Sequence, residues 1–137
     1  MKIAALDIGD AWIGIALSDP MGILARPFKT ITAHELLSAI PALISEQKLA
    51  TIVIGYPKTM RGTESEQTKK IVALKERLET QFPAISWVLW DERLSSKRAA
   101  SQKKATTKEE KIKSHAIAAA FILESYLLYR KNLQNIE

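Results

Sequence analysis

Short apolar runs separated by turn residues open the chain. Residues 2–6 (KIAAL) and 12–18 (WIGIALS) are apolar enough for two buried strands, and the glycine-containing segment between them is typical of a turn. This part of the sequence therefore predicts a β-hairpin. A shorter third strand is predicted over 26–31, where Pro27 favours an edge position because proline cannot donate a hydrogen bond to a neighbouring strand.

The rest of the chain alternates between helical and strand patterns. Apolar residues recur at helical spacing over 34–47 and 64–81; Thr32 is a candidate cap for the first helix, and Pro41 predicts a late start or a kink in it. The remaining expected elements are strands over 51–55 and 85–90, a helix over 95–103, a mobile loop over 104–113 and a last helix over 114–133. This order predicts a single α/β domain over 1–137, with a mixed five-stranded sheet flanked by helices on both faces.

Composition narrows the class of protein. The chain has 137 residues, of which 47% are hydrophobic and 26% charged, as in an ordinary globular domain. Cysteine is absent, which excludes a disulfide framework, a zinc-cysteine site and a thiol nucleophile, and fits a reducing compartment. No apolar run approaches the length of a membrane span or of a signal-peptide core. We therefore expect a cytoplasmic protein without a membrane partner.

Positive charge is concentrated in one segment. The net charge is +5, and residues 97–113 hold seven lysines and arginines against two glutamates, so this segment alone accounts for an excess of five. Such a patch is either a solvated surface or a contact surface for a polyanion such as nucleic acid. The candidate contacts within it are Lys97, Arg98, Lys103 and Lys104.

Carboxylates follow two of the predicted strands. Asp7 comes directly after the first apolar run, and Asp91 and Glu92 follow the last one. Ligands of α/β sheets bind at strand ends, and a carboxylate there is costly unless it is paired or binds a cation. The alternatives are therefore a helix cap or an ion pair, for instance with Arg93, and a site for Mg²⁺ or Mn²⁺, which prefer oxygen ligands. Two such ions can support phosphodiester cleavage.

Several motifs, taken together, resemble one family. Matching blocks lie in the same order over nearly the whole chain: residues 6–9 (LDIG), 13–19 (IGIALSD), 25–27 (ARP), 52–57 (IVIGYP) with Met60, Gly62–Glu64 and Gln67, 91–96 (DERLSS) and 122–127 (ILESYL). This set resembles the YqgF/RuvX family of the ribonuclease H-like superfamily, which is related to the RuvC Holliday-junction resolvases. The resemblance implies a ribonuclease H-like fold.

The same resemblance implies an activity and a site. Family members are metal-dependent nucleases, usually assigned to trimming the 5′ end of the small-subunit rRNA precursor, and some are described as Holliday-junction resolvases. Carried over to this chain, Asp7 is the first metal ligand and Glu92 the second, with Asp91 as its close competitor. The third acid of the family falls on His115. Imidazole can ligate Mn²⁺ or act as a general acid or base, whereas the alternative is a surface histidine after a Ser114 helix cap.

Further basic residues are candidates for phosphate contact. Arg26 and Arg93 suit bidentate binding, although Arg93 could equally pair with a strand-end acid. Lys58 and Arg61 lie in the loop before the helix over 64–81. Trp87 and Trp90 should lie on opposite faces of one strand, which favours core packing over base stacking for both.

Three functions remain open beside an rRNA nuclease. A Holliday-junction resolvase would act on branched DNA as a dimer, and the sequence leaves monomer and homodimer equally open. A non-catalytic nucleic-acid-binding module on the same fold is favoured by His115 in place of an acid. The Asp7–Gly9 turn also resembles the opening of actin-like and sugar-kinase folds, but those need two such lobes and this chain has room for one.

Overall fold

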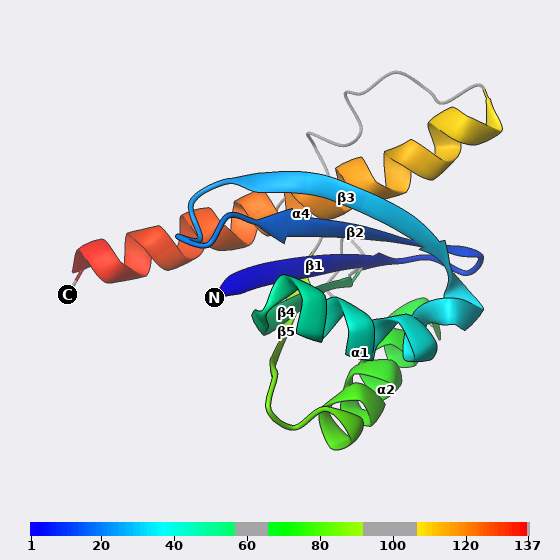
Figure 1. Ribbon diagram of the computed structural model, residues 1–137, viewed down its shortest axis with the longest axis horizontal. Helices are drawn as coiled ribbons and strands as arrows, with labels where there is room; N and C mark the ends of the chain where they lie inside the picture. The colour runs from blue at the N-terminus through cyan, green and yellow to red at the C-terminus, as the bar shows by residue number, and fades with distance from the viewer. Residues whose placement is uncertain (57–65, 92–106, 137) are drawn as a thin grey trace.

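A mixed five-stranded sheet forms the centre of the molecule (Figure 1), as the sequence predicts. The computed structural model describes residues 1–56, 66–91 and 107–136. The strand order is β3-β2-β1-β4-β5; β1 and β2 form the expected antiparallel hairpin, β3 is antiparallel to β2, and β4 and β5 continue the sheet in parallel. The strands are β1 (Lys2–Ile8), β2 (Trp12–Ser18), β3 (Ala25–Thr32), β4 (Leu49–Tyr56) and β5 (Ser86–Asp91).

Helices cover both faces of the sheet. Figure 1 shows α1 (Leu36–Gln47) and α2 (Glu66–Gln81) on one face and α4 (Lys108–Ile136) running along the other. A short 3-10 turn, η1 (Ala33–Glu35), leads from β3 into α1. Within the described part of the chain, none of these helices combines the length and the apolar character that a membrane span requires.

Side-chain alternation along the strands divides the core into two clusters. One set of alternating residues, including Leu6, Ile15 and Ile54, packs against α1 and α2. The other set packs against α4 and is built from smaller side chains, such as Ala5 and Ala16. The two tryptophans of β5 follow the same rule and confirm the prediction: Trp87 joins the α1/α2 cluster, and Trp90 packs on the α4 side.

The last helix starts earlier than predicted. It begins at Lys108, so the expected mobile loop over 104–113 is wrong for residues 108–113, and Ser114 lies within the helix rather than at its cap. Thr107 fills the capping role, because its Oγ1 accepts a hydrogen bond from the Glu110 N–H at 3.1 Å. The charged residues of the first turns carry no apolar periodicity, but lysine and glutamate are good helix formers.

The remaining elements that the structure describes match the predictions closely, with small differences at their ends. β3 begins at Ala25 and β4 at Leu49, each somewhat earlier than predicted. Thr32 forms a capping box with Glu35, whose Oε1 accepts the Thr32 N–H at 3.2 Å, so the expected cap is confirmed on η1. Pro41 lies inside α1 without ending it. The helix predicted over 95–103 lies outside the described residues.

Candidate metal and nucleic-acid site

The carboxylate of Asp7 lies at the end of β1 on the face that α4 covers. In the sheet Asp7 is paired with Gly14 of β2 and with Gly55 of β4, so no side chain flanks it on either neighbouring strand. Asp7 is half-buried, and its carboxylate makes no hydrogen bond or ion pair within the described residues. A half-buried carboxylate without a protein partner is a candidate for binding a cation.

Helix α4 crosses β2 in direct contact with its backbone at Gly14. A Cβ atom on Gly14 would lie 1.9 Å from the carbonyl oxygen of His115 and 2.7 Å from the amide nitrogen of Ala116. These are backbone atoms, which cannot turn aside as the end of a side chain can. Glycine is therefore required here for the close approach of helix and sheet.

This approach brings His115 to the same end of the sheet as Asp7. The Cε1 atom of the His115 ring lies 3.8 Å from the position of a Cβ on Gly9, two residues after Asp7. The ring is half-buried and has no hydrogen-bond partner in the described part of the chain. His115 therefore lies within α4 rather than directly after a helix cap, so the expected cap at Ser114 is wrong.

Asp91 does not join this pair. It is paired with Tyr56 of β4, and Tyr56 packs with the cluster beneath α1 and α2. The side chain of Asp91 thus leaves the sheet on the face opposite to Asp7, and it has an interaction of its own. Glu92, its competitor for the second carboxylate, lies outside the described residues.

Asp7 and His115 together offer two of the ligand types that divalent cations use. Asp7 offers carboxylate oxygens and His115 an imidazole nitrogen, a mixed set that suits Mn²⁺ better than Mg²⁺. The residues that the structure describes contain no group of three histidine, cysteine, aspartate or glutamate side chains able to hold a metal ion. Within the described ranges, Asp7 and His115 are therefore the two side chains that this site offers to a cation.

Of the residues singled out as phosphate contacts, the structure describes only Arg26. Arg26 is exposed on β3 opposite Leu17, three residues along β2 from Gly14, so it lies about 10 Å along the strands from the row of Asp7. The structure does not bring it to the end of the sheet that holds Asp7. The other predicted contacts, which are Lys58, Arg61, Arg93, Lys97, Arg98, Lys103 and Lys104, lie outside the described residues.

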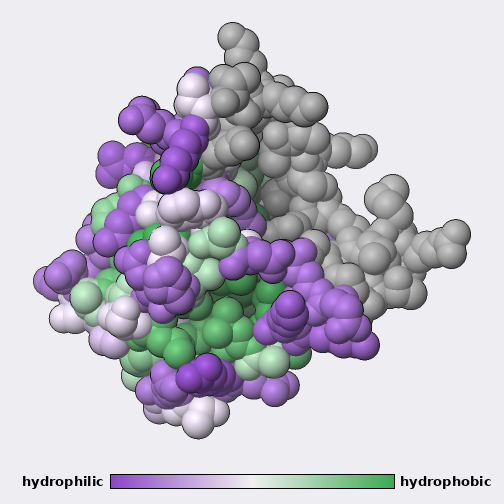
Figure 2. All heavy atoms as spheres, turned by 90° about the vertical axis from the view of Figure 1, so that its right-hand side faces the viewer, coloured by the Kyte–Doolittle hydropathy of each residue, from purple (hydrophilic) through white to green (hydrophobic). Residues whose placement is uncertain are grey.

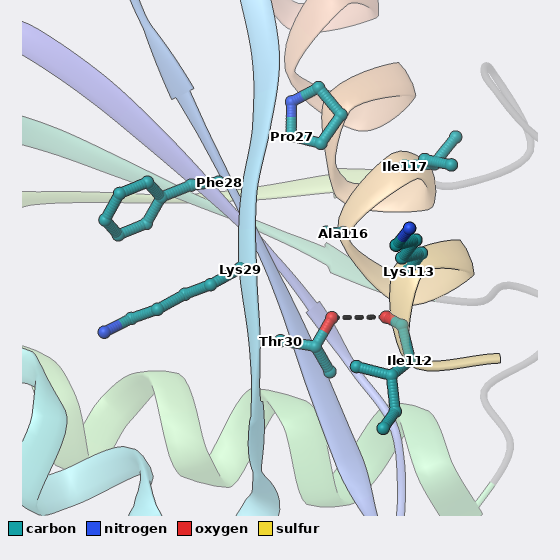
Figure 3. Close-up of a pocket in the computed structure, with 8 residues that line it drawn as sticks. All are labelled: Pro27, Phe28, Lys29, Thr30, Ile112, Lys113, Ala116 and Ile117. Carbon is teal, nitrogen blue, oxygen red and sulfur yellow. Dashed lines mark hydrogen bonds between the residues drawn. The ribbon is translucent and has the colours of Figure 1, made fainter. Parts of the chain in front are cut away.

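Sequence reasoning did not single out Lys29, which the structure places near Lys113. Lys29 and Lys113 line an open pocket of about 520 Å³ between the edge strand β3 and the first turns of α4. Figure 3 shows that Phe28 and Lys29 project away from α4, whereas Thr30 faces it. Lys113 belongs to the basic segment that the sequence predicts as a nucleic-acid contact, but nothing in the sequence places Lys29 near it.

The end of the molecule that holds Asp7 is predominantly hydrophilic at its rim. The β1–β2 turn and the start of α4 lie on the right in Figure 1, the side that faces the viewer in Figure 2. Hydrophilic residues surround a hydrophobic area in the lower part of that view. This hydrophobic area lies at the height of α1 and α2, on the side of the sheet away from α4.

Comparisons with known proteins support the expected fold. RuvC of Thermus thermophilus, solved in complex with a Holliday-junction substrate, matches with a TM-score of 0.59, 14% identity and 96% coverage of both chains. A second structure of Thermus thermophilus RuvC matches with a TM-score of 0.58, 15% identity and coverage of 96% of this chain and 97% of that one. At these identities the likeness concerns the fold, which is the ribonuclease H-like fold predicted from the sequence.

Comparisons of sequence identify the family. A protein of Sulfurihydrogenibium sp. named "Putative pre-16S rRNA nuclease" is 40% identical, with 92% of this chain and 89% of that protein covered. A protein of the same name from Lachnospira eligens is 38% identical, covering 93% of this chain and 96% of that protein. The family model described as "RuvX: Holliday junction resolvase" matches residues 1–129. Both descriptions are those of nucleases, and the chain belongs to the RuvX family, as its sequence motifs predict.

Proposed function

We propose that this chain is a metal-dependent nuclease whose substrate is the 5′-extended precursor of 16S rRNA, acting in the cytoplasm as a single domain over 1–137. The observation that carries the proposal is the meeting of Asp7 and His115 on the α4 face, where neither side chain has a partner within the described residues. The names of the related proteins support the substrate, and the RuvX family supports phosphodiester hydrolysis.

The proposal assigns a role to each site residue. Asp7 and Glu92 are carboxylate ligands of Mg²⁺ or Mn²⁺, and His115 is the third ligand, in the place of the family's third acid. The position of Asp91 on the opposite face supports Glu92 rather than Asp91 as the second carboxylate. When bound, the ion would supply activation of a water molecule and stabilisation of charge on the leaving oxygen.

Basic residues complete the proposal. Lys58, Arg61, Arg93 and the segment over 97–113 would hold the phosphate backbone, and Arg26 would contact a more distant part of it. Neutralising several phosphates releases counterions, so binding should weaken steeply as salt is raised from 50 to 200 mM.

A cleavage assay tests the proposal. Wild type, Asp7→Asn and Asp91→Asn are incubated with a 5′-extended 16S rRNA precursor in Mn²⁺, in Mg²⁺ and in chelator. We expect wild type to cleave only with metal, Asp7→Asn to lose at least about 100-fold in rate, and the matched control Asp91→Asn to remain within about threefold of wild type. Equal activity of Asp7→Asn and wild type would refute the assignment.

Holliday-junction resolution is the second candidate, favoured by the description of the family model itself. It is tested in the same assay with a four-way DNA junction as substrate. Symmetric incision of two strands, with the protein dimeric at assay concentration, would select this function over rRNA processing. Metal-independent binding of either substrate without cleavage would select the non-catalytic module.

A further inference from the structure

One transverse row of the sheet lies beneath the start of α4. Asp7 of β1 is paired with Gly14 of β2, and Gly14 is paired with Thr30 of β3. Paired residues of adjacent strands project from the same face, so all three face α4. The proposed metal ligand therefore shares its row with two residues that contact the helix carrying His115.

Thr30 makes a specific contact with the backbone of that helix. Its hydroxyl donates a hydrogen bond to the carbonyl oxygen of Ile112 at 2.5 Å, and Figure 3 shows this bond linking β3 and α4. A helix carbonyl has two lone pairs, so it can accept this bond in addition to a helical one. Ile112 precedes His115 by three residues, which places the bond within one turn of the imidazole.

Gly14 and Thr30 restrain the helix in complementary ways. The contact at Gly14 sets how closely α4 approaches the sheet, because the backbone of His115 rests on it. A contact of that kind does not stop the helix from sliding or rotating over the surface. The hydrogen bond from Thr30 restrains both motions, because it fixes the carbonyl oxygen of Ile112 relative to the strand row that holds Asp7.

We propose that Thr30 is a positioning residue: its hydroxyl fixes the second turn of α4 so that the imidazole of His115 faces the carboxylate of Asp7. Its effect on cation binding rests on the proposed function, whereas its effect on the place of His115 does not. Partners that orient a metal ligand typically change metal affinity by about 10–100-fold when they are removed.

The first test measures by NMR, without any metal, how close the His115 ring lies to Gly9. The chain has two histidines, so their ring protons are readily assigned by NMR. Because Cε1 of His115 lies 3.8 Å from the Cβ position of Gly9, we expect a nuclear Overhauser effect between the ring Hε1 and a Gly9 Hα in wild type. Thr30→Val should weaken it at least about twofold, and Thr30→Ser, which keeps the hydroxyl, should restore it.

The second test reads the concentration of Mn²⁺ needed for half-maximal cleavage. We expect Thr30→Val to raise it about tenfold and Thr30→Ser to return it to the wild-type value. Thr80→Val is the matched control, because the Thr80 hydroxyl donates to a helix carbonyl, that of Glu76 at 3.0 Å, on α2 away from the site. Thr30→Ala removes the same hydroxyl and replaces the valine variant if that variant does not fold.

The outcomes separate the two proposals. An unchanged Overhauser effect in folded Thr30→Val or Thr30→Ala would overturn the positioning role. A changed effect in a protein that shows no metal-dependent cleavage would leave the positioning role standing and refute the proposed function. Equal changes in Thr30→Val and Thr80→Val would also overturn the role, because the effect would then be a general one of losing a hydroxyl.

Discussion

The two faces of the sheet are built from side chains of different size. Toward α1 and α2 the three inner strands present mainly isoleucine and leucine, as at Ile15, Ile52 and Ile54. Toward α4 the same strands present small residues beside Asp7, with larger side chains only at Ile3 and Val53; the small residues are Ala5, Gly14, Ala16 and Gly55. One face thus holds its helices at a distance filled by large side chains, and the other lets a helix rest on the backbone of a strand.

The two faces contribute different properties to the fold. The α1/α2 face buries most of the large aliphatic side chains, which are the main source of hydrophobic stabilisation. The α4 face buries fewer large side chains. Its small residues let the backbone of α4 contact β2, which places His115 near the end of β1. The small residue at Gly14 is therefore required for the close approach of α4 to β2.

The largest expected effect comes from adding one carbon atom to the α4 face. Gly14→Ala places a methyl group 1.9 Å from the carbonyl oxygen of His115, so the helix or the strand must shift. We expect a loss of about 3 kcal/mol in the free energy of unfolding, at the upper end of overpacking effects. Urea denaturation measures it. A loss below about 1 kcal/mol would show that α4 can move away freely.

A smaller effect is expected from removing one carbon atom from the opposite face. Ile54 is fully buried beneath α1 and α2, and Ile54→Val leaves a small cavity. The expected loss is about 1 kcal/mol, with the Overhauser effect between His115 and Gly9 unchanged, because the α4 face is not disturbed. If this variant alters the place of His115, the two faces are not independent.

The smallest effect concerns the turn between β2 and β3, at the far end of the α4 face. Backbone N–H groups of Leu24 and Ile23 bond to the Asp19 carboxylate and hold its pKa below the ordinary value. The stabilisation is complete above the unfolded pKa, near 3.9, and is lost as the pH falls through the lower folded pKa. Between pH 6 and 2.5, the Tm of Asp19→Asn should therefore fall less than that of wild type, which thermal unfolding followed by circular dichroism measures.

Asp10→Asn is the control for that experiment. Asp10 is exposed in the turn between β1 and β2, and its side chain has no hydrogen bond within the described residues. Its replacement should leave the pH dependence of Tm as in wild type. If both variants flatten the profile equally, the local hydrogen bonds of Asp19 are not the cause.

The sequence predicts the elements well where burial controls them. The inner strands β1, β2 and β4 are apolar runs because they are buried on both faces. Trp87 and Trp90 of β5 divide between the faces as alternation requires. The start of α4 was missed because it is exposed: residues 108–110 carry charge and no apolar periodicity, so only helix propensity and the Thr107 cap indicate it.

The sequence identifies the candidate site residues, but it does not show how the fold arranges them in space. Asp7 and His115 are recognisable from the family motifs, whereas the exclusion of Asp91 depends on the strand register, where one residue decides the face. The contact of Gly14 with His115 joins residues 101 positions apart, and the hydrogen bond from Thr30 spans 82 positions. No local pattern encodes such tertiary contacts.

The central claim is that Asp7 and His115 hold one divalent cation on the α4 face, and paramagnetic broadening by Mn²⁺ tests it most directly. His34, which is exposed in η1 next to Glu35, serves as the internal reference. At substoichiometric Mn²⁺ we predict that the ring signals of His115 broaden before those of His34. This selectivity should disappear in Asp7→Asn and persist in Asp91→Asn. Equal broadening of both histidines in wild type, or selectivity that survives in Asp7→Asn, would contradict the account.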